Sequence, residues 1–246
     1  MRRLCCVLLA AASLLSCNHH KTGATGENVS DSPATTNTTP AADLLQTMLG
    51  SFVGDFGGNK ITLLITKISG DSVSGRSIVA GNNRPFAGTF TRRDDTFVFN
   101  ASEPGDDKYD GVFHFEIKQS APDVVNGSWK PNDTNRPEKS YSLQRRSFEY
   151  HADAGTYPEA STRLLKPADV EDRMKEDLEY MRNEIFARHG YCFNKKDMRQ
   201  QFETLDWYVP NTVDIKGYLT DIEKKNIALI KRYEKYAQDY GDEYGR

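Results

Sequence analysis

Apolar and polar residues alternate in short runs over residues 44–148. Turn residues (Gly, Pro, Asn and Asp) separate the runs from one another. Alternation with period two is typical of strands that bury one face, and about eight such runs at roughly 8–12-residue spacing indicate an antiparallel β-barrel or sandwich. The strands are expected at 52–56, 61–68, 73–79, 85–90, 96–99, 111–117, 125–129 and 141–143.

The spacing of apolar residues becomes helical after Pro167. The first helix is expected to end at Gly190, where a left-handed residue is common. The second is expected to begin at Asn194, and the third at a capping box formed by Thr220 and Glu223. The chain is therefore predicted to be an α+β protein, with an antiparallel β domain (44–148), a linker (149–164), a small three-helix domain (165–238) and a tail (239–246).

The first sixteen residues have the pattern of an export signal. Two arginines precede an apolar run at 4–15, which is too short to span a bilayer but suits a signal peptide. The following Ser16-Cys17 completes a segment that resembles the lipobox of bacterial lipoproteins. This resemblance implies cleavage before Cys17 and lipidation of that residue, and Asn18 after it favours the outer membrane. Residues 17–43 are polar and are expected to form a flexible tether.

Charge and cysteine content narrow the classes of function. The chain of 246 residues carries 32 basic and 35 acidic residues, for a net charge of -3, and removal of the two signal-peptide arginines takes it to -5. This balance argues against nucleic acid as a partner. Of the four cysteines only Cys192 lies beyond residue 17, so no disulfide is expected, and we interpret Cys192 as a buried thiol.

Two features of the β domain suggest ligands, and each has a simpler explanation. Four carboxylates between Glu103 and Asp110 suggest a calcium loop, but Lys108 occupies a ligand position, so a solvated hairpin loop is favoured. Trp129 and Tyr141 either line a barrel mouth for a small ligand or belong to the core, and the core is favoured. Residues 50–56 weakly resemble the first strand of lipocalin-like barrels.

The helical segment carries a more specific pattern. Residues 186–190 read Phe-Ala-Arg-His-Gly, preceded by Arg-Asn-Glu-Ile and followed by Trp-Tyr-Val-Pro at 207–210 and by an amphipathic stretch at 219–230. In this order the motifs resemble the YARHG domain of exported bacterial proteins, with Phe186 in place of the leading Tyr. The resemblance implies an accessory or binding role, with no agreed biochemical activity.

The spacing within this motif predicts several contacts. Glu184 and Arg188 form an i, i+4 pair in the favourable orientation, expected to contribute a few tenths of a kcal/mol. Asn183 and Asn226 are expected to bridge helices through their amides. Arg182, two helical turns before the motif histidine, leaves open a joint site with it.

Two interpretations of the motif are open. The set either locks three small helices together as a polar scaffold or binds an anionic ligand such as a peptidoglycan fragment. The candidate binding residues are Arg182, Asn183, Arg188, His189, Trp207 and Tyr208.

Enzyme motifs are not evident in the sequence. It contains neither HExxH nor GxSxG, so we expect no catalytic residue, metal or cofactor. The expected function is that of a lipid-anchored binding or structural module of the cell envelope, with the membrane and either peptidoglycan or another envelope protein as partners. The alternatives are an accessory factor or hydrolase acting on envelope polymers, or small-ligand binding by the β domain.

Overall fold

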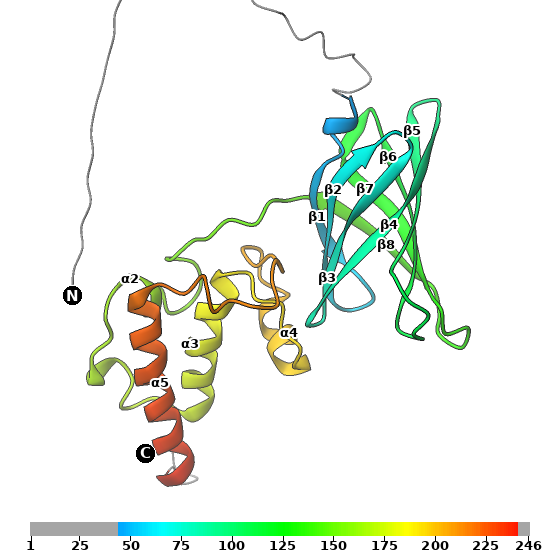
Figure 1. The fold of residues 1–246 in the computed structure, drawn as a ribbon. Helices are drawn as coiled ribbons and strands as arrows, with labels where there is room; N and C mark the ends of the chain where they lie inside the picture. Colours follow the sequence, from blue (N-terminus) through cyan, green and yellow to red (C-terminus); the bar gives the residue numbers. More distant parts are fainter. Residues whose placement is uncertain (1–43, 241–246) are drawn as a thin grey trace, which may run out of the picture. The chain divides into compact units, whose positions relative to one another are not determined.

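The computed structural model describes residues 44–240. The expected signal peptide, Cys17, the tether and the last six residues lie outside this range. The described part contains eight strands followed by helices (Figure 1). The α+β prediction is therefore confirmed, and the strands form a barrel.

The barrel is a meander in which each strand pairs antiparallel with the next. Closure occurs between β1 and β8 through two residue pairs, Phe52 with Arg145 and Val53 with Gln144. The strands are β1 (Gly50–Asp55), β2 (Lys60–Ser69), β3 (Ser72–Val79), β4 (Asn82–Arg93), β5 (Thr96–Ser102), β6 (Gly111–Lys118), β7 (Ala121–Pro131) and β8 (Lys139–Arg145).

Aromatic side chains fill the barrel interior. The rings of Phe99 and Phe115 stack at 4.6 Å, and Phe113 lies 6.4 Å from Trp129 and 6.3 Å from Tyr141. Trp129 and Tyr141 are 8% and 7% exposed and belong to the core cluster, as the favoured interpretation predicted. Close packing of this kind is how small barrels are stabilised.

The carboxylate-rich loop between β5 and β6 is less solvated than expected. Glu103 and Asp110, at its two ends, are buried. Glu103 accepts hydrogen bonds from Ser77 Oγ (2.9 Å) and Trp129 Nε1 (3.2 Å), and Asp110 pairs with Arg84. The prediction of a fully solvated loop was therefore wrong at its ends, because these two carboxylates find donors on neighbouring strands.

Within the described range, five helical segments follow the barrel. They are α2 (Glu159–Thr162), the 3₁₀ turn η1 (Pro167–Asp169), α3 (Lys175–Arg188), α4 (Lys196–Phe202) and α5 (Asp221–Tyr240). The apolar faces of α3 and α5 form one buried cluster with α2. A second cluster, rich in aromatic residues, joins α3 to α4 and to the segment after it.

The helix boundaries test the expected caps. Gly190 follows α3 with φ +69°, as predicted. Thr220 Oγ1 accepts from Glu223 N at 3.2 Å, and Thr220 N donates to the Glu223 carboxylate at 2.8 Å, so the capping box is confirmed. The second helix begins at Lys196 and not at Asn194, and its N-cap residue is Lys195, which makes no side-chain cap hydrogen bond.

Hydrogen bonds also connect strand β2 with the segment after α4. Lys60 Nζ donates to the carbonyls of Leu205 (2.8 Å) and Tyr208 (3.2 Å), and Thr62 Oγ1 donates to Pro210 O at 2.5 Å. The carbonyl acceptors hold this ammonium group in a partly desolvated place, and the burial lowers the pKa of Lys60.

Candidate functional site

The motif helix α3 buries charged side chains as well as apolar ones. Asn183, Glu184, Arg188 and the C-cap residue His189 are all buried. Buried charges are costly unless they are paired and hydrogen-bonded. The partners of these groups therefore show what the motif does.

Glu184 and Arg188 form a fully buried ion pair. Arg188 Nη2 donates to Glu184 Oε2 at 2.7 Å, and both side chains are 0% exposed. The Glu184 carboxylate also accepts from the backbone N–H groups of Thr156 (2.6 Å) and Tyr157 (2.7 Å). Arg188 Nε donates to Ala154 O at 2.7 Å. The predicted i, i+4 pair is therefore confirmed. The expected contribution of a few tenths of a kcal/mol applies to exposed pairs, whereas the segment before α2 covers this one.

A second buried carboxylate lies beside this pair. Glu223 Oε1 accepts from Ser161 Oγ at 2.8 Å and from the Tyr150 hydroxyl at 3.1 Å, while Glu223 Oε2 lies 2.8 Å from His189 Nε2. Arg188 Nη1 donates to Ser161 Oγ at 3.0 Å, which links the two carboxylates. We call these six residues, Tyr150, Ser161, Glu184, Arg188, His189 and Glu223, the ionic cluster.

The environment of the ionic cluster shifts the pKa values of three members. Burial and the neighbouring Glu223 raise the pKa of Tyr150 to about 12. Burial tends to raise the pKa of Glu223, but hydrogen bonds from His189, Thr220 N and Ser161 outweigh it and lower the pKa to about 2. Burial lowers the pKa of Arg188, and the neighbouring carboxylates oppose this effect. Glu223 is therefore held as a carboxylate by its donors.

A glycine allows the backbone to reach the cluster. Gly155 has φ +94°, and a Cβ atom there would lie 2.2 Å from Glu184 Oε1. Only glycine combines this conformation with so close an approach. The loop that supplies the two backbone donors to Glu184 thus depends on one residue without a side chain.

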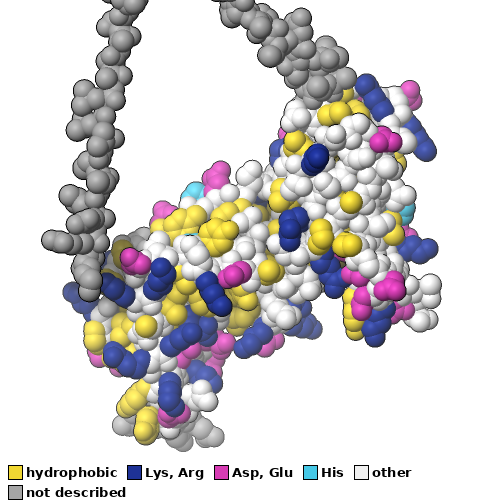
Figure 2. Space-filling view, in the orientation of Figure 1, with side chains coloured by type: hydrophobic (Ala, Val, Ile, Leu, Met, Phe, Trp, Pro, Cys, Tyr) yellow, Lys and Arg dark blue, Asp and Glu magenta, His cyan; other side chains and the backbone are white. Residues whose placement is uncertain are grey.

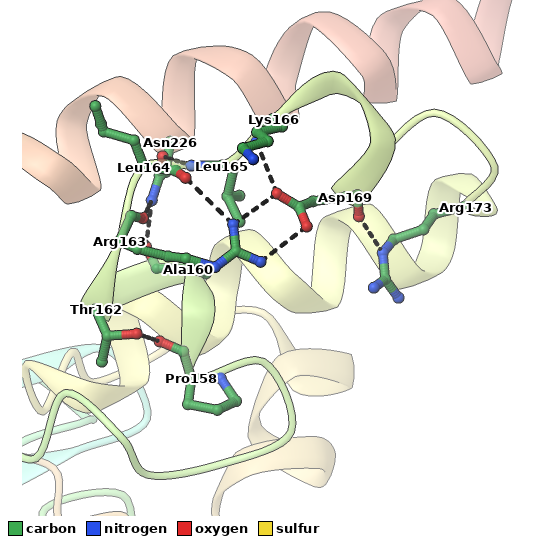
Figure 3. Close-up of polar contacts among 10 residues, drawn as sticks. All are labelled: Pro158, Ala160, Thr162, Arg163, Leu164, Leu165, Lys166, Asp169, Arg173 and Asn226. Atoms are coloured by element: carbon green, nitrogen blue, oxygen red, sulfur yellow. Dashed lines mark hydrogen bonds and ion pairs between the residues drawn. The ribbon is translucent and has the colours of Figure 1, made fainter.

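Asn226 on α5 fixes the chain on the other side of α2. Its Oδ1 accepts from Leu165 N at 2.9 Å, and its Nδ2 donates to Ala160 O (2.9 Å) and Arg163 O (2.7 Å). Figure 3 shows these bonds beside the fork in which Arg163 binds the Asp169 carboxylate. Asn226 therefore bridges two segments as predicted.

The amide of Asn183 behaves differently. Its Nδ2 donates to Glu179 O within the same helix at 2.9 Å, so the expected bridge to another helix was wrong. Arg182 pairs with Glu234 on α5 at 2.7 Å, whereas His189 lies in the ionic cluster. The structure thus places Arg182 and His189 with different partners, and the joint site left open by the spacing does not form.

The remaining candidate residues also separate. Tyr208 is fully buried among the aromatic rings of Phe193 and Phe202, and its hydroxyl donates to Tyr191 O at 2.8 Å. Trp207 is partly exposed and contacts Tyr208 edge to face. The six candidates therefore divide between the ionic cluster, an aromatic core and a surface groove.

The surface groove has a volume of about 530 Å³ and lies beside α3. We call it the α3 groove, and its lining residues come from α3, the segment 191–198, the loop 213–219 and α5. Arg182 and Asn183 line it, whereas no residue of the ionic cluster does. The motif helix thus holds the fold together with one side and borders an open cavity with the other.

The order of contacts in the cluster differs from that of a hydrolytic triad. In such a triad the nucleophile donates to a histidine, which a carboxylate orients. Here Ser161 and His189 both contact the same carboxylate, that of Glu223. This geometry binds three segments together and places the histidine on the carboxylate, not on the serine hydroxyl.

Tyr150 and Ser161 are cluster members that sequence reasoning missed. Both lie in the segment expected to be a linker, where no periodicity marks a residue that contacts the helices. The stacking of the Tyr150 ring on His189, at 4.5 Å, is a tertiary contact without a local signal. Glu223 was identified only as a helix cap, and its cap role is the signal that pointed to it.

Two further features are absent from residues 44–240. No three His, Cys, Asp or Glu side chains there are grouped so as to hold a metal ion. In the same range, none of the helices combines the length and apolarity needed to cross a bilayer.

Comparison with known proteins gives one match. No curated protein and no solved structure matches the chain. Comparison with protein families matches residues 154–235 to the YARHG domain. The match begins within the segment expected to be a linker and includes Ser161, in accordance with the packing of α2 against α3 and α5. The C-terminal part of the chain, residues 154–235, is therefore a YARHG domain.

Proposed function

We propose that this protein is a lipid-anchored, non-catalytic binding module of the bacterial cell envelope. In this proposal Cys17 is lipidated at the outer membrane, residues 18–43 are a tether, and the YARHG domain provides the binding surface. The partner is peptidoglycan or another envelope protein. The lipobox-like sequence supports the anchor, and the two-sided helix α3 supports the binding role.

One observation carries the proposal. The charged motif residues Glu184 and Arg188 are fully buried and bonded to groups of the protein itself. Such residues stabilise a fold, whereas a catalytic group must reach a substrate. The α3 groove, by contrast, opens to solvent beside the same helix. The geometry therefore favours a rigid scaffold that presents a groove.

The packed barrel interior favours the same assignment of roles. Phe86, Phe113 and Phe115 are each 1% exposed, and ring centroids in this interior lie 4.6–6.4 Å apart. Side chains thus occupy the space that a small ligand would need. This packing favours the YARHG domain over the barrel as the binding element.

Two measurements test the proposal. In cells grown with a labelled fatty acid, the Cys17→Ala variant should carry no label and should be absent from the membrane fraction. The control Cys6→Ala, within the expected signal peptide, should carry the label and remain in the membrane fraction. Label retained by Cys17→Ala would refute the anchor. Residues 18–246 should either co-sediment with isolated sacculi or become cross-linked to an envelope protein. Failure in both assays would refute the binding role.

A further inference from the structure

The α3 groove has an apolar floor. Phe186 and Tyr191 meet there edge to face, with ring centroids 6.2 Å apart and an interplanar angle of 69°. Ile215 and Val213 add aliphatic surface, and Val213 is 39% exposed although it is apolar. The volume of the α3 groove, about 530 Å³, lies in the range of ligand pockets.

An unused hydrogen-bond acceptor lies in this groove. Asn183 is 7% exposed and lines the groove. Its Nδ2 donates within α3, but among the described residues nothing donates to its Oδ1. This oxygen is not one of the buried atoms that lack a hydrogen-bond partner, so a ligand in the groove can reach it. The groove therefore suits a ligand that carries an N–H group.

Basic residues predominate along the groove. Four cations (Arg182, Lys195, Lys216 and Lys231) and two carboxylates (Glu179 and Asp214) line it. Arg182 is paired with Glu234, but the three lysines are exposed and form no ion pair within the described range. Figure 2 shows dark blue basic side chains bordering yellow apolar surface over the helical part. The free charge of the rim is therefore positive.

We propose that the α3 groove binds an extended acidic peptide segment of a partner protein, a conclusion that rests on the proposed binding role of the YARHG domain. An apolar side chain of the peptide lies on Phe186 and Tyr191. A backbone N–H donates to Asn183 Oδ1, and acidic side chains pair with Lys216 and Lys231 at the rim.

The groove distinguishes a peptide from other anions. A phosphate or a polyanionic sugar would use the lysines, but it would leave the apolar floor without a partner. A peptide with alternating acidic and apolar residues supplies the N–H donor, the apolar surface and the negative charge together, because successive side chains of an extended chain point in opposite directions. All three features of the groove are then used.

The test uses residues 18–246 and three fluorescein-labelled octapeptides in a polarisation titration. The first alternates glutamate with leucine, the second lysine with leucine, and the third glutamate with serine. Binding of the first at least about tenfold tighter than of either control is expected. Equal binding of the first and third would overturn the role of the floor, and equal binding of the first and second would overturn the role of the charge.

Groove variants place the peptide on the structure. Lys216→Glu/Lys231→Glu should weaken binding of the glutamate–leucine peptide about tenfold, and Val213→Asp by a similar factor. The matched control Lys224→Glu/Lys225→Glu makes the same charge change on exposed positions of α5 that do not line the groove. The five substituted positions are all exposed, so every variant should keep the parental melting temperature. Equal weakening by the control pair would overturn the assignment to the groove.

The outcome is separable from that of the proposed function. If the chain is retained by sacculi or by a cross-linked envelope protein but does not bind the peptides, the peptide proposal fails and the envelope role stands. If the peptides bind but envelope retention is absent, the groove assignment stands and the partner lies elsewhere. Loss of both would refute both.

Discussion

Replacement of Arg188 tests whether the YARHG motif is a scaffold. Arg188→Met keeps most of the side-chain volume but removes the guanidinium group. It deletes the bonds to Glu184, Ser161 Oγ and Ala154 O and leaves the Glu184 carboxylate, 0% exposed, with only two backbone donors. The perturbation therefore creates an uncompensated buried charge.

The expected loss of unfolding free energy follows from this burial. Breaking a buried ion pair by removal of one partner costs about 3–5 kcal/mol. A domain of this size has a total stability of about 5–15 kcal/mol, so the loss would be a large fraction of it. In Glu184→Gln/Arg188→Met the buried charge is gone and the amide oxygen still accepts one N–H. The double variant should therefore be more stable than Arg188→Met by at least about 1 kcal/mol.

Urea unfolding followed by the helical circular dichroism signal measures both quantities, because the barrel contributes little to that signal. A loss of less than about 1 kcal/mol for Arg188→Met would show that Arg188 is not a structural ion-pair partner. Absence of any recovery in the double variant would show that the buried charge of Glu184 is not the cause of the loss.

Three further predictions follow from single residues. The pKa of Glu223 is about 2 in the folded protein against 4.5 ordinarily, so its contribution to stability should be complete above about pH 4.5 and lost as the pH falls toward 2. Glu223→Gln should therefore flatten the dependence of the melting temperature on pH across that window. An unchanged profile would contradict the assignment. Gly155→Ala should lower the free energy of unfolding in urea by at least about 2 kcal/mol more than Gly58→Ala does. Both glycines have positive φ, but only Gly155→Ala would place a Cβ atom against Glu184. Equal losses would argue against the close approach. Burial raises the pKa of Cys192 to about 11, so the native thiol should react with iodoacetamide ~100-fold more slowly than the thiol in urea, and rapid native labelling would show that the site opens.

The strands were predictable because their burial alternates. Strand β6 (Gly111–Lys118) alternates between inward and outward side chains, and its expected range was 111–117. The choice between barrel and sandwich was not predictable, since both give the same alternation. It depends on whether β1 pairs with β8, a contact between distant parts of the chain that leaves no local pattern.

The ends of the helices were also predictable where a local signal exists. The capping box at Thr220 and the left-handed Gly190 act through their immediate neighbours. The ionic cluster was not predictable, because Tyr150 and Ser161 reach it only through tertiary folding. The polar residues buried on α3, such as Glu184, also break the simple relation between polarity and exposure.

The narrow seam between β1 and β8 has a consequence for the order of folding. Every other pairing in the barrel joins strands that are consecutive in the chain, so each needs only a short loop to close. The seam joins Phe52 to Arg145 and Val53 to Gln144 across the whole domain, which makes it the contact of greatest loop entropy. As the chain is synthesised, seven strands can accumulate as successive hairpins, but β1 can complete its hydrogen bonding only after β8 has emerged. An unclosed edge is thus exposed until the last strand arrives, and the amide of Val53, which faces β8, is expected to be protected late in folding.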